Sequence, residues 1–317
     1  MPTALSSSQL KLLRPLEEGL KFSVVDGDDE GADKALRQII VIFGLDKKHP
    51  RLIRAKLWAY EAALNKNNLS YAESGFISVR RQVSRKSRLY LEATILLSVC
   101  LLRQKKIDPA KHLIKEVVVS LNNIQSDRRR HQFQRRFVER VEEECILSEL
   151  IGSLVGSLDP REIQQKAILL VQQKSEDEIY AEMGNALPQG SVLTLSAVRN
   201  FSILLLPPPD RKLLPAPEVA QKPVQMGKRT MSALKRIGWR TFCHSKSPLY
   251  RLWSENFPEM LNGAHFATGI SMVFGQWKIG ITSLATTFAA SAMRAGVQEF
   301  CDRTKPQGLM IDVKDKD

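Results

Sequence analysis

The sequence predicts a mainly α-helical protein: a helical array, then a proline-rich linker, then a basic and finally apolar helical C-terminal module. Along residues 1–206, apolar residues recur at the spacing of one helix face, in segments of roughly twelve to eighteen residues. Short polar turns separate these segments. Residues 207–227 are rich in proline and have no periodicity, and the composition changes after them, so we expect the third part to span 228–317.

Composition favours a globular chain with an anionic partner. The 317 residues are long enough for two domains, and the hydrophobic fraction of 43% and the charged fraction of 26% are ordinary for a folded protein. The formal net charge of +13 favours nucleic acid, an anionic membrane surface or an acidic protein as partner. The alternative is a solvated basic surface without a specific partner.

The four cysteines are Cys100, Cys145, Cys243 and Cys301, and none forms a CxxC pair. Nothing in their spacing resembles a disulfide framework or a zinc site. The first residues lack the apolar core of a signal peptide. The simplest inference is a reducing, cytoplasmic compartment, with peripheral attachment to a membrane left open.

Helices are expected in close succession along the first part of the chain. Pro15 and Gly19 weaken the first helix, whereas Pro50 suits a helix start. Segment 191–206 fits either a strand or one buried helix, and 308–313 could add a short strand. The expected helices span residues 9–25, 32–44, 51–65, 70–83, 88–104, 109–121, 126–152, 160–174 and 175–184.

A repeat of large and small residues runs through residues 30–122. The pattern is carried by Leu97, Ser98, Leu101, Ile107, Ala110, Ile114 and Val117, more weakly by Leu69, Ala72, Phe76 and Val79, and faintly by Ala32, Leu36 and Ile39. The region resembles a degenerate tetratricopeptide array, although its alanines are 40 and 38 residues apart, against about 34 in that family. The resemblance implies a platform that binds macromolecules and performs no chemistry. A plain helical bundle is the alternative.

Segment 126–152 has a basic first half and an acidic second half. This order opposes the helix dipole, which favours acids early and bases late, so we interpret the bases as candidates for polyanion binding. An ordinary solvated face with pairs such as Arg135–Glu139 is the alternative. The candidate residues are Arg128, Arg129, Arg130, Arg135 and Arg136.

A second basic segment follows the linker. Between Val219 and Ser254 there is no acidic residue, and aromatic residues are interleaved with the bases. Such a composition suits nucleic acid or an anionic bilayer. The candidate residues here are Lys228, Arg229, Lys235, Arg236 and Arg240.

Residues 261–301 are strongly apolar. Two runs, 266–275 and 279–293, are separated by Gln276-Trp277-Lys278, and neither reaches the roughly 18 residues of a spanning helix. We expect a helical hairpin, either buried in a soluble core or engaged with a membrane. Its candidate residues are Phe266, Ile270, Phe274, Trp277, Ile281, Leu284 and Phe288.

Catalytic signatures such as GxSxG, the phosphate-binding loop and HExxH are absent from the sequence, and its five histidines are scattered. We therefore expect a protein without enzymatic activity, cofactor or metal. The leading hypothesis is an adaptor or scaffold that binds another macromolecule, expected to be a protein, through its helical array. The alternatives are a membrane-associating module that uses the C-terminal hairpin and a nucleic-acid-binding protein that uses the basic clusters. The oligomeric state stays open.

Overall fold

The fold is mainly helical, which confirms the prediction of a mainly α-helical protein. The computed structural model describes residues 4–153, 156–205, 219, 221–244, 247–255, 265–306 and 308–309. Within these residues there are helices and connections but no strand.

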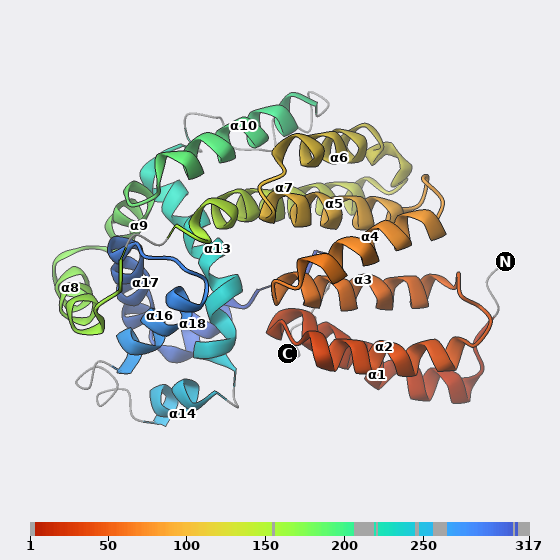
Figure 1. The fold of residues 1–317 in the computed structure, drawn as a ribbon, viewed down its shortest axis with the longest axis horizontal. Helices are drawn as coiled ribbons and strands as arrows, with labels where there is room; N and C mark the ends of the chain where they lie inside the picture. Colours follow the sequence, from red (N-terminus) through yellow and green to blue (C-terminus); the bar gives the residue numbers. More distant parts are fainter. Residues whose placement is uncertain are drawn as a thin grey trace. The chain divides into compact units, whose positions relative to one another are not determined.

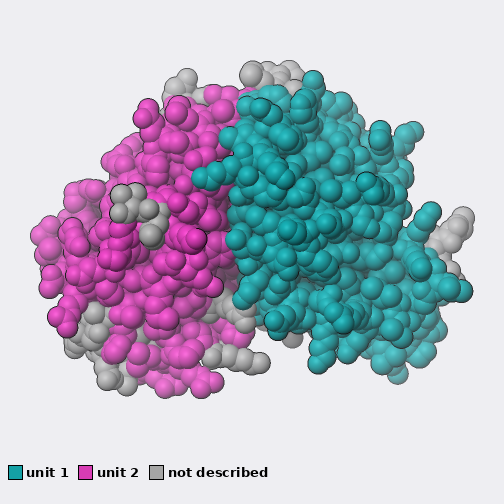
Figure 2. Space-filling view, viewed as in Figure 1, with its two compact units in different colours: residues 1–141, 201–207, 307–317 teal, residues 142–200, 208–306 magenta. Residues whose placement is uncertain are grey.

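The chain divides into two compact units, shown in teal and magenta in Figure 2. Unit 1 comprises residues 1–141, 201–207 and 307–317, and unit 2 comprises 142–200 and 208–306. Most of the predicted linker, 207–227, lies outside the described residues. The predicted domain boundaries therefore stay a prediction.

Unit 1 is a succession of antiparallel helices whose bounds agree with the expected segments to within a few residues (Figure 1). Helix α7 starts in unit 1 and ends in unit 2. The helices are α1 Ser7–Asp26, α2 Asp29–Phe43, α3 Pro50–Asn65, α4 Leu69–Gln82, α5 Arg88–Arg103, α6 Ile107–Val119, the short 3₁₀ helix Leu121–Asn123 and α7 Asp127–Leu150.

Local sequence explains several helix starts. Ser6 caps α1 and forms a capping box with Gln9, so amides that the helix leaves unpaired are satisfied. Ser87 caps α5 through the amide of Tyr90. The α1 helix ends at Gly27, whose φ of 60° is a left-handed conformation that glycine adopts readily.

The helices of unit 1 form hairpins α1–α2, α3–α4 and α5–α6, and each hairpin packs against the next through α2–α3 and α4–α5. The first helices of the hairpins also touch one another, α1 with α3 and α3 with α5. Ala32, Ala72 and Ala110 are fully buried. Small side chains at these positions let neighbouring helices approach closely.

Ala110 offers a test of this packing. Replacing Ala110 with leucine should overpack the contact of α6 with its neighbours and lower the free energy of unfolding by about 1–3 kcal/mol. Chemical denaturation followed by circular dichroism measures the change. Lys115→Leu, at an exposed position of the same helix, is the matched control and should have little effect. A parent-like midpoint for Ala110→Leu would contradict the tight packing.

Unit 2 holds the second part of α7 and the remaining helices, except that residues 201–205 of α10 belong to unit 1. Segment 191–206, which the sequence left open, lies in a helix up to Leu205. Gly308 and Leu309 are not part of a strand, and the rest of 308–313 is outside the described residues. The helices are α8 Pro160–Gln173, α9 Glu176–Asn185, α10 Gln189–Leu205, α13 Pro223–Cys243, α14 Pro248–Glu255, α16 His265–Gln276, α17 Thr282–Ala295 and α18 Val297–Thr304.

The tightest helix pair of unit 2 joins α9 to α13. Two glycines make the approach possible: a Cβ on Gly184 would clash with the backbone oxygen of Pro223, and a Cβ on Gly227 would clash with that of Tyr180. Helices α16 and α17 pack against each other and against α8. They form the expected hairpin, and α16 ends at Gln276, where the sequence predicts a break.

The expectation that no cysteines are paired is wrong for two of them. Cys243 at the end of α13 and Cys301 in α18 form a disulfide across 58 residues, with their Cα atoms 5.3 Å apart. Their spacing gave no hint because the fold, and not the sequence, brings the two helices together. Cys100 and Cys145 are buried free thiols, as expected from their apolar surroundings. Cytoplasmic localisation stays a prediction.

Candidate functional site

The outer face of α1 carries an exposed apolar stripe, which we call the α1 stripe: Leu12, Pro15, Gly19 and Phe22. At 100° per residue these positions fall within an arc of about 80°. Leu12 is 62% exposed and Phe22 is 58% exposed. No atom lies within 4 Å of a Cβ built on Gly19, so the stripe is open at its centre.

The opposite side of α1 packs into the core of unit 1, so the α1 stripe faces away from that core. Leu13, Leu20 and Val24 are buried in the core that α1 shares with α2 and α3. A surface helix normally has one apolar face and one polar face, whereas α1 has apolar residues on both. Exposed apolar patches with polar borders often mark interaction sites.

Charged residues border the α1 stripe. Lys11, Arg14 and Glu18 are exposed on the flanking positions of α1. Glu17 forms an ion pair with Arg51 of α3 through two hydrogen bonds, of 2.5 and 2.9 Å. At 100° per residue, Lys11, Arg14 and Glu18 all lie on one side of the stripe, so the charged border is one-sided.

The sequence pattern contained this stripe, but we interpreted it differently. Pro15 and Gly19 count as helix-weakening residues when propensity alone is considered. Their spacing with Leu12 and Phe22, at steps of three, four and three residues, is the signal that identifies them as one face.

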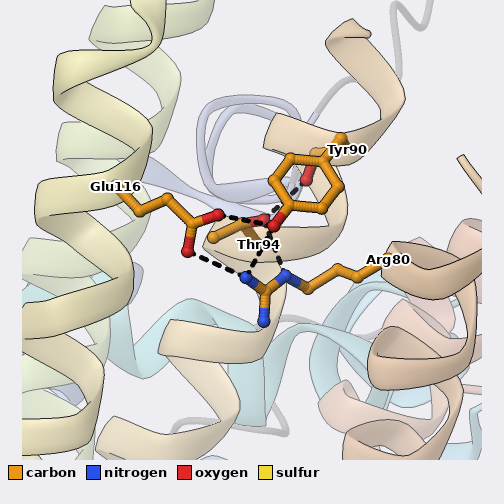
Figure 3. Close-up of polar contacts among 4 residues, drawn as sticks. All are labelled: Arg80, Tyr90, Thr94 and Glu116. Carbon is orange, nitrogen blue, oxygen red and sulfur yellow. Dashed lines mark hydrogen bonds and ion pairs between the residues drawn. The ribbon is translucent and has the colours of Figure 1, made fainter. Parts of the chain in front are cut away.

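A polar cluster joins three consecutive helices of unit 1 (Figure 3). Arg80 of α4 donates to Thr94 Oγ1 at 3.0 Å, to the Tyr90 hydroxyl at 3.0 Å and to Glu116 Oε2 at 2.8 Å. The Tyr90 hydroxyl donates to the other Glu116 oxygen at 2.5 Å. Arg80 is thus neutralised by Glu116 of α6, and the cluster connects α4, α5 and α6.

Electrostatics in this cluster favour a structural role. Burial raises the pKa of Tyr90, and so does its hydrogen bond to Glu116, while the charge of Arg80 opposes the shift. The hydroxyl therefore stays protonated near neutral pH and cannot act there as a base. The cluster fixes helix positions and leaves no reactive group.

Two buried carboxylates lie on the first helices of neighbouring hairpins. Burial raises the pKa of Glu92, and the positive charges of Arg88 and Arg54 oppose this shift. Glu61, only 1% exposed, accepts a hydrogen bond of 2.8 Å from the backbone amide of Leu309. Both carboxylates therefore interact with other groups of the protein. Among the described residues, no group of three histidine, cysteine or acidic side chains could hold a metal ion.

The predicted polyanion-binding residues of α7 lie on its first turns. Arg128, Arg129 and Arg135 are exposed. Arg130 forms an ion pair of 2.6 Å with Asp127, and Arg136 is half-buried. The α7 helix therefore presents three exposed guanidinium groups to solvent.

The predicted polyanion-binding residues of α13 are placed differently. Arg229 pairs with Glu142 at 2.9 Å, and Arg236 pairs with Glu143 in a buried contact. Lys228 pairs with Asp177 at 2.8 Å, and Lys235 is half-buried. The side chain of Arg240 is outside the described residues.

Acidic residues far away in sequence thus neutralise much of the charge on α13. Glu142 lies between Arg229 and Arg199, the latter at 3.5 Å. Burial raises the pKa of Glu142, whereas the two guanidinium groups lower it. Arg199 and Arg229 also line a small pocket, and both pair with Glu142.

The residues proposed for the C-terminal hairpin lie in unit 2. Trp277 and Ile281 are half-buried. None of the helices that the structure describes is both long and apolar enough to cross a membrane. The buried members are Phe266, Ile270, Phe274, Leu284 and Phe288.

Comparisons with protein families, with curated proteins and with solved structures found no match for this chain. Its function is therefore inferred from its own geometry.

Proposed function

We propose that this protein is a non-enzymatic scaffold that binds another protein through the helical array of unit 1. The α1 stripe is the observation that carries the proposal. Leu12 and Phe22, both more than half exposed, would be poorly placed in water unless a partner covered them.

The proposal includes a tetratricopeptide-like arrangement of unit 1. Three successive helical hairpins with contacts between their first helices support it, and so do the buried alanines Ala32, Ala72 and Ala110 near the repeat positions. In such arrays each repeat buries its apolar face against a neighbour. The α1 stripe is the face on which a further helix would pack.

The partner surface that fits is an amphipathic helix. A helix with apolar residues three and four positions apart can lie along Leu12, Pro15, Gly19 and Phe22, and Gly19 permits a close approach. The bordering charges Lys11, Arg14 and Glu18 would then orient the partner.

Substituting Phe22 tests this function. Phe22→Glu should weaken partner binding by at least about 30-fold, or on the order of 2 kcal/mol, because a carboxylate replaces a central aromatic contact. Tagged full-length protein is used to recover partners from the native source, with quantitative mass spectrometry. Analytical ultracentrifugation determines whether the partner is a second copy of the chain.

Gln38→Glu is the matched control, since Gln38 is exposed on α2 and the substitution introduces the same carboxylate. The control should recover the partner as the parent does, and both variants should show parent-like circular dichroism. Equal recovery by Phe22→Glu and the parent, or a parent that binds no protein and stays monomeric, would refute the proposal.

A further inference from the structure

Three connections of unit 1 lie at one end of the array, the end where α1 starts (Figure 1). They are 44–49 between α2 and α3, 83–87 between α4 and α5, and 120–126 between α6 and α7. We call this the basic end. Successive helices are antiparallel, so every second connection returns to the same end.

The basic end carries many exposed cations. They come from the first two connections and from the adjoining turns of α3, α4 and α7, so they are not the product of one charged helix. The exposed bases are Lys47, Lys48, Arg54, Arg81, Arg85, Lys86, Arg128 and Arg129.

Nearby carboxylates cancel only part of this charge: most form an ion pair with a cation outside the eight, and Glu92 interacts with Arg54 as well as Arg88. The ion pairs are Glu17–Arg51, Glu92–Arg88, Glu116–Arg80 and Asp127–Arg130, with closest distances of 2.5, 2.8, 2.8 and 2.6 Å. The connections themselves contain one acidic residue, the half-buried Asp46. The eight exposed bases therefore face a surface with little opposing charge.

Hydrogen bonds link parts of this surface that are distant in the sequence. The Asn123 amide donates to the backbone oxygen of Arg85 at 3.4 Å, which links the second connection to the third. Lys56 of α3 donates to Gln82, at the end of α4, at 2.7 Å. Burial lowers the pKa of Lys56, and the positive charge of Lys47 in the first connection lowers it further.

Side-chain contacts among α4, α5 and α6 support the basic end. The Arg80–Tyr90–Glu116 cluster joins α4, α5 and α6 near those of their ends that lie at the basic end (Figure 3). With packed helices usually 8–10 Å apart, a row of three connections spans about 20 Å. That length corresponds to roughly six phosphates of one strand at about 3.4 Å each.

We propose that the basic end binds the phosphate backbone of a nucleic-acid duplex without sequence specificity. Arginine, which supplies five of the eight bases, donates to phosphate oxygens through a planar fork. The exposed large apolar residues described at this end include Ile40, Val41, Leu45 and Val119, and none of these is aromatic. Single-strand binding relies on aromatic stacking, so the surface favours a duplex.

The test measures binding of the full chain to a fluorescent duplex DNA of 20 base pairs by anisotropy as salt is raised. The logarithm of the binding constant should fall with the logarithm of salt concentration, with a slope of about −5 for six phosphate contacts. The triple variant Arg85→Glu, Arg128→Glu and Arg129→Glu should bind at least tenfold more weakly at low salt. Its slope should be shallower by about one per lost contact.

A second triple variant controls for net charge. Lys34→Glu, Lys66→Glu and Lys105→Glu makes the same charge change at exposed positions towards the opposite end of unit 1. It should retain at least half of the parent affinity, and Phe22→Glu should leave duplex binding unchanged. Each variant is first checked for an unfolding curve like that of the parent protein.

Three outcomes would overturn the inference. The first is no binding of duplex by the parent at low salt. The second is equal loss of binding in the two triple variants, which would show a general charge effect. The third is binding to phosphatidylserine vesicles that the basic-end variant abolishes, without duplex binding, which would assign the surface to a membrane.

Discussion

Replacing Gly227 with alanine is expected to destabilise unit 2 by roughly 3 kcal/mol, a large effect for one methyl group. The reason is the close contact between α9 and α13: the new Cβ would clash with the backbone oxygen of Tyr180. A backbone atom cannot rotate away as a side chain can, so the two helices must separate. Separating the two helices would also disrupt the close contact between Gly184 of α9 and the backbone of Pro223 in α13.

The measurement is chemical denaturation followed by tryptophan fluorescence, with hydrogen exchange to locate the change in α9 and α13. Trp239 is a suitable reporter because its indole donates to the Cys301 backbone oxygen at 3.0 Å. Gly238→Ala is the matched control, since the nearest atoms to its Cβ would lie at 3.6 Å, an ordinary contact. That variant should gain up to about 1 kcal/mol from helix propensity. Equal stability of the two variants would contradict the close crossing.

Replacing Ala289 with arginine is expected to unfold the α16–α17 region of unit 2. Ala289 is fully buried in α17, and nothing around it can hydrate a guanidinium group. An unpaired buried charge typically costs on the order of 4 kcal/mol or more. Protease resistance of residues 265–304, read by mass spectrometry, should be lost in the absence of lipid.

Ser283→Arg serves as the control because Ser283 is exposed on the same helix. It should remain as resistant as the parent. If the hairpin instead engaged a membrane, Ala289→Arg would keep the lipid-free fold and lose only liposome association. That result, together with strong binding of the parent to anionic liposomes at high salt, would contradict the core placement.

Periodicity in the sequence was sufficient to predict most helices of unit 1. The segments ending near Asn65 and Arg103 were found because their apolar spacing follows one helix period and polar turns separate them. Segment 191–206 could not be assigned, because a continuous apolar run fits a buried strand as well as a helix. In the structure, residues 191–205 belong to α10.

Candidate sites were harder to predict than helices, because charge in a sequence does not reveal where its partner lies. Arg229 and Arg236 belong to a segment without acids, yet Glu142 and Glu143 neutralise them from almost ninety residues or more away. Arg128 and Arg129 could be identified from sequence as exposed bases, but their grouping with Arg85 required the fold.

By itself, the sequence determined the helical class, the helix starts and the basic character of this protein, because capping, periodicity and composition act over a few residues. Only the tertiary structure decided which cations stay exposed, which cysteines pair and which apolar face of α1 is left open. Those outcomes depend on contacts between segments distant in the chain. Asn123 beside Arg85 and Cys243 beside Cys301 are neighbours only after folding.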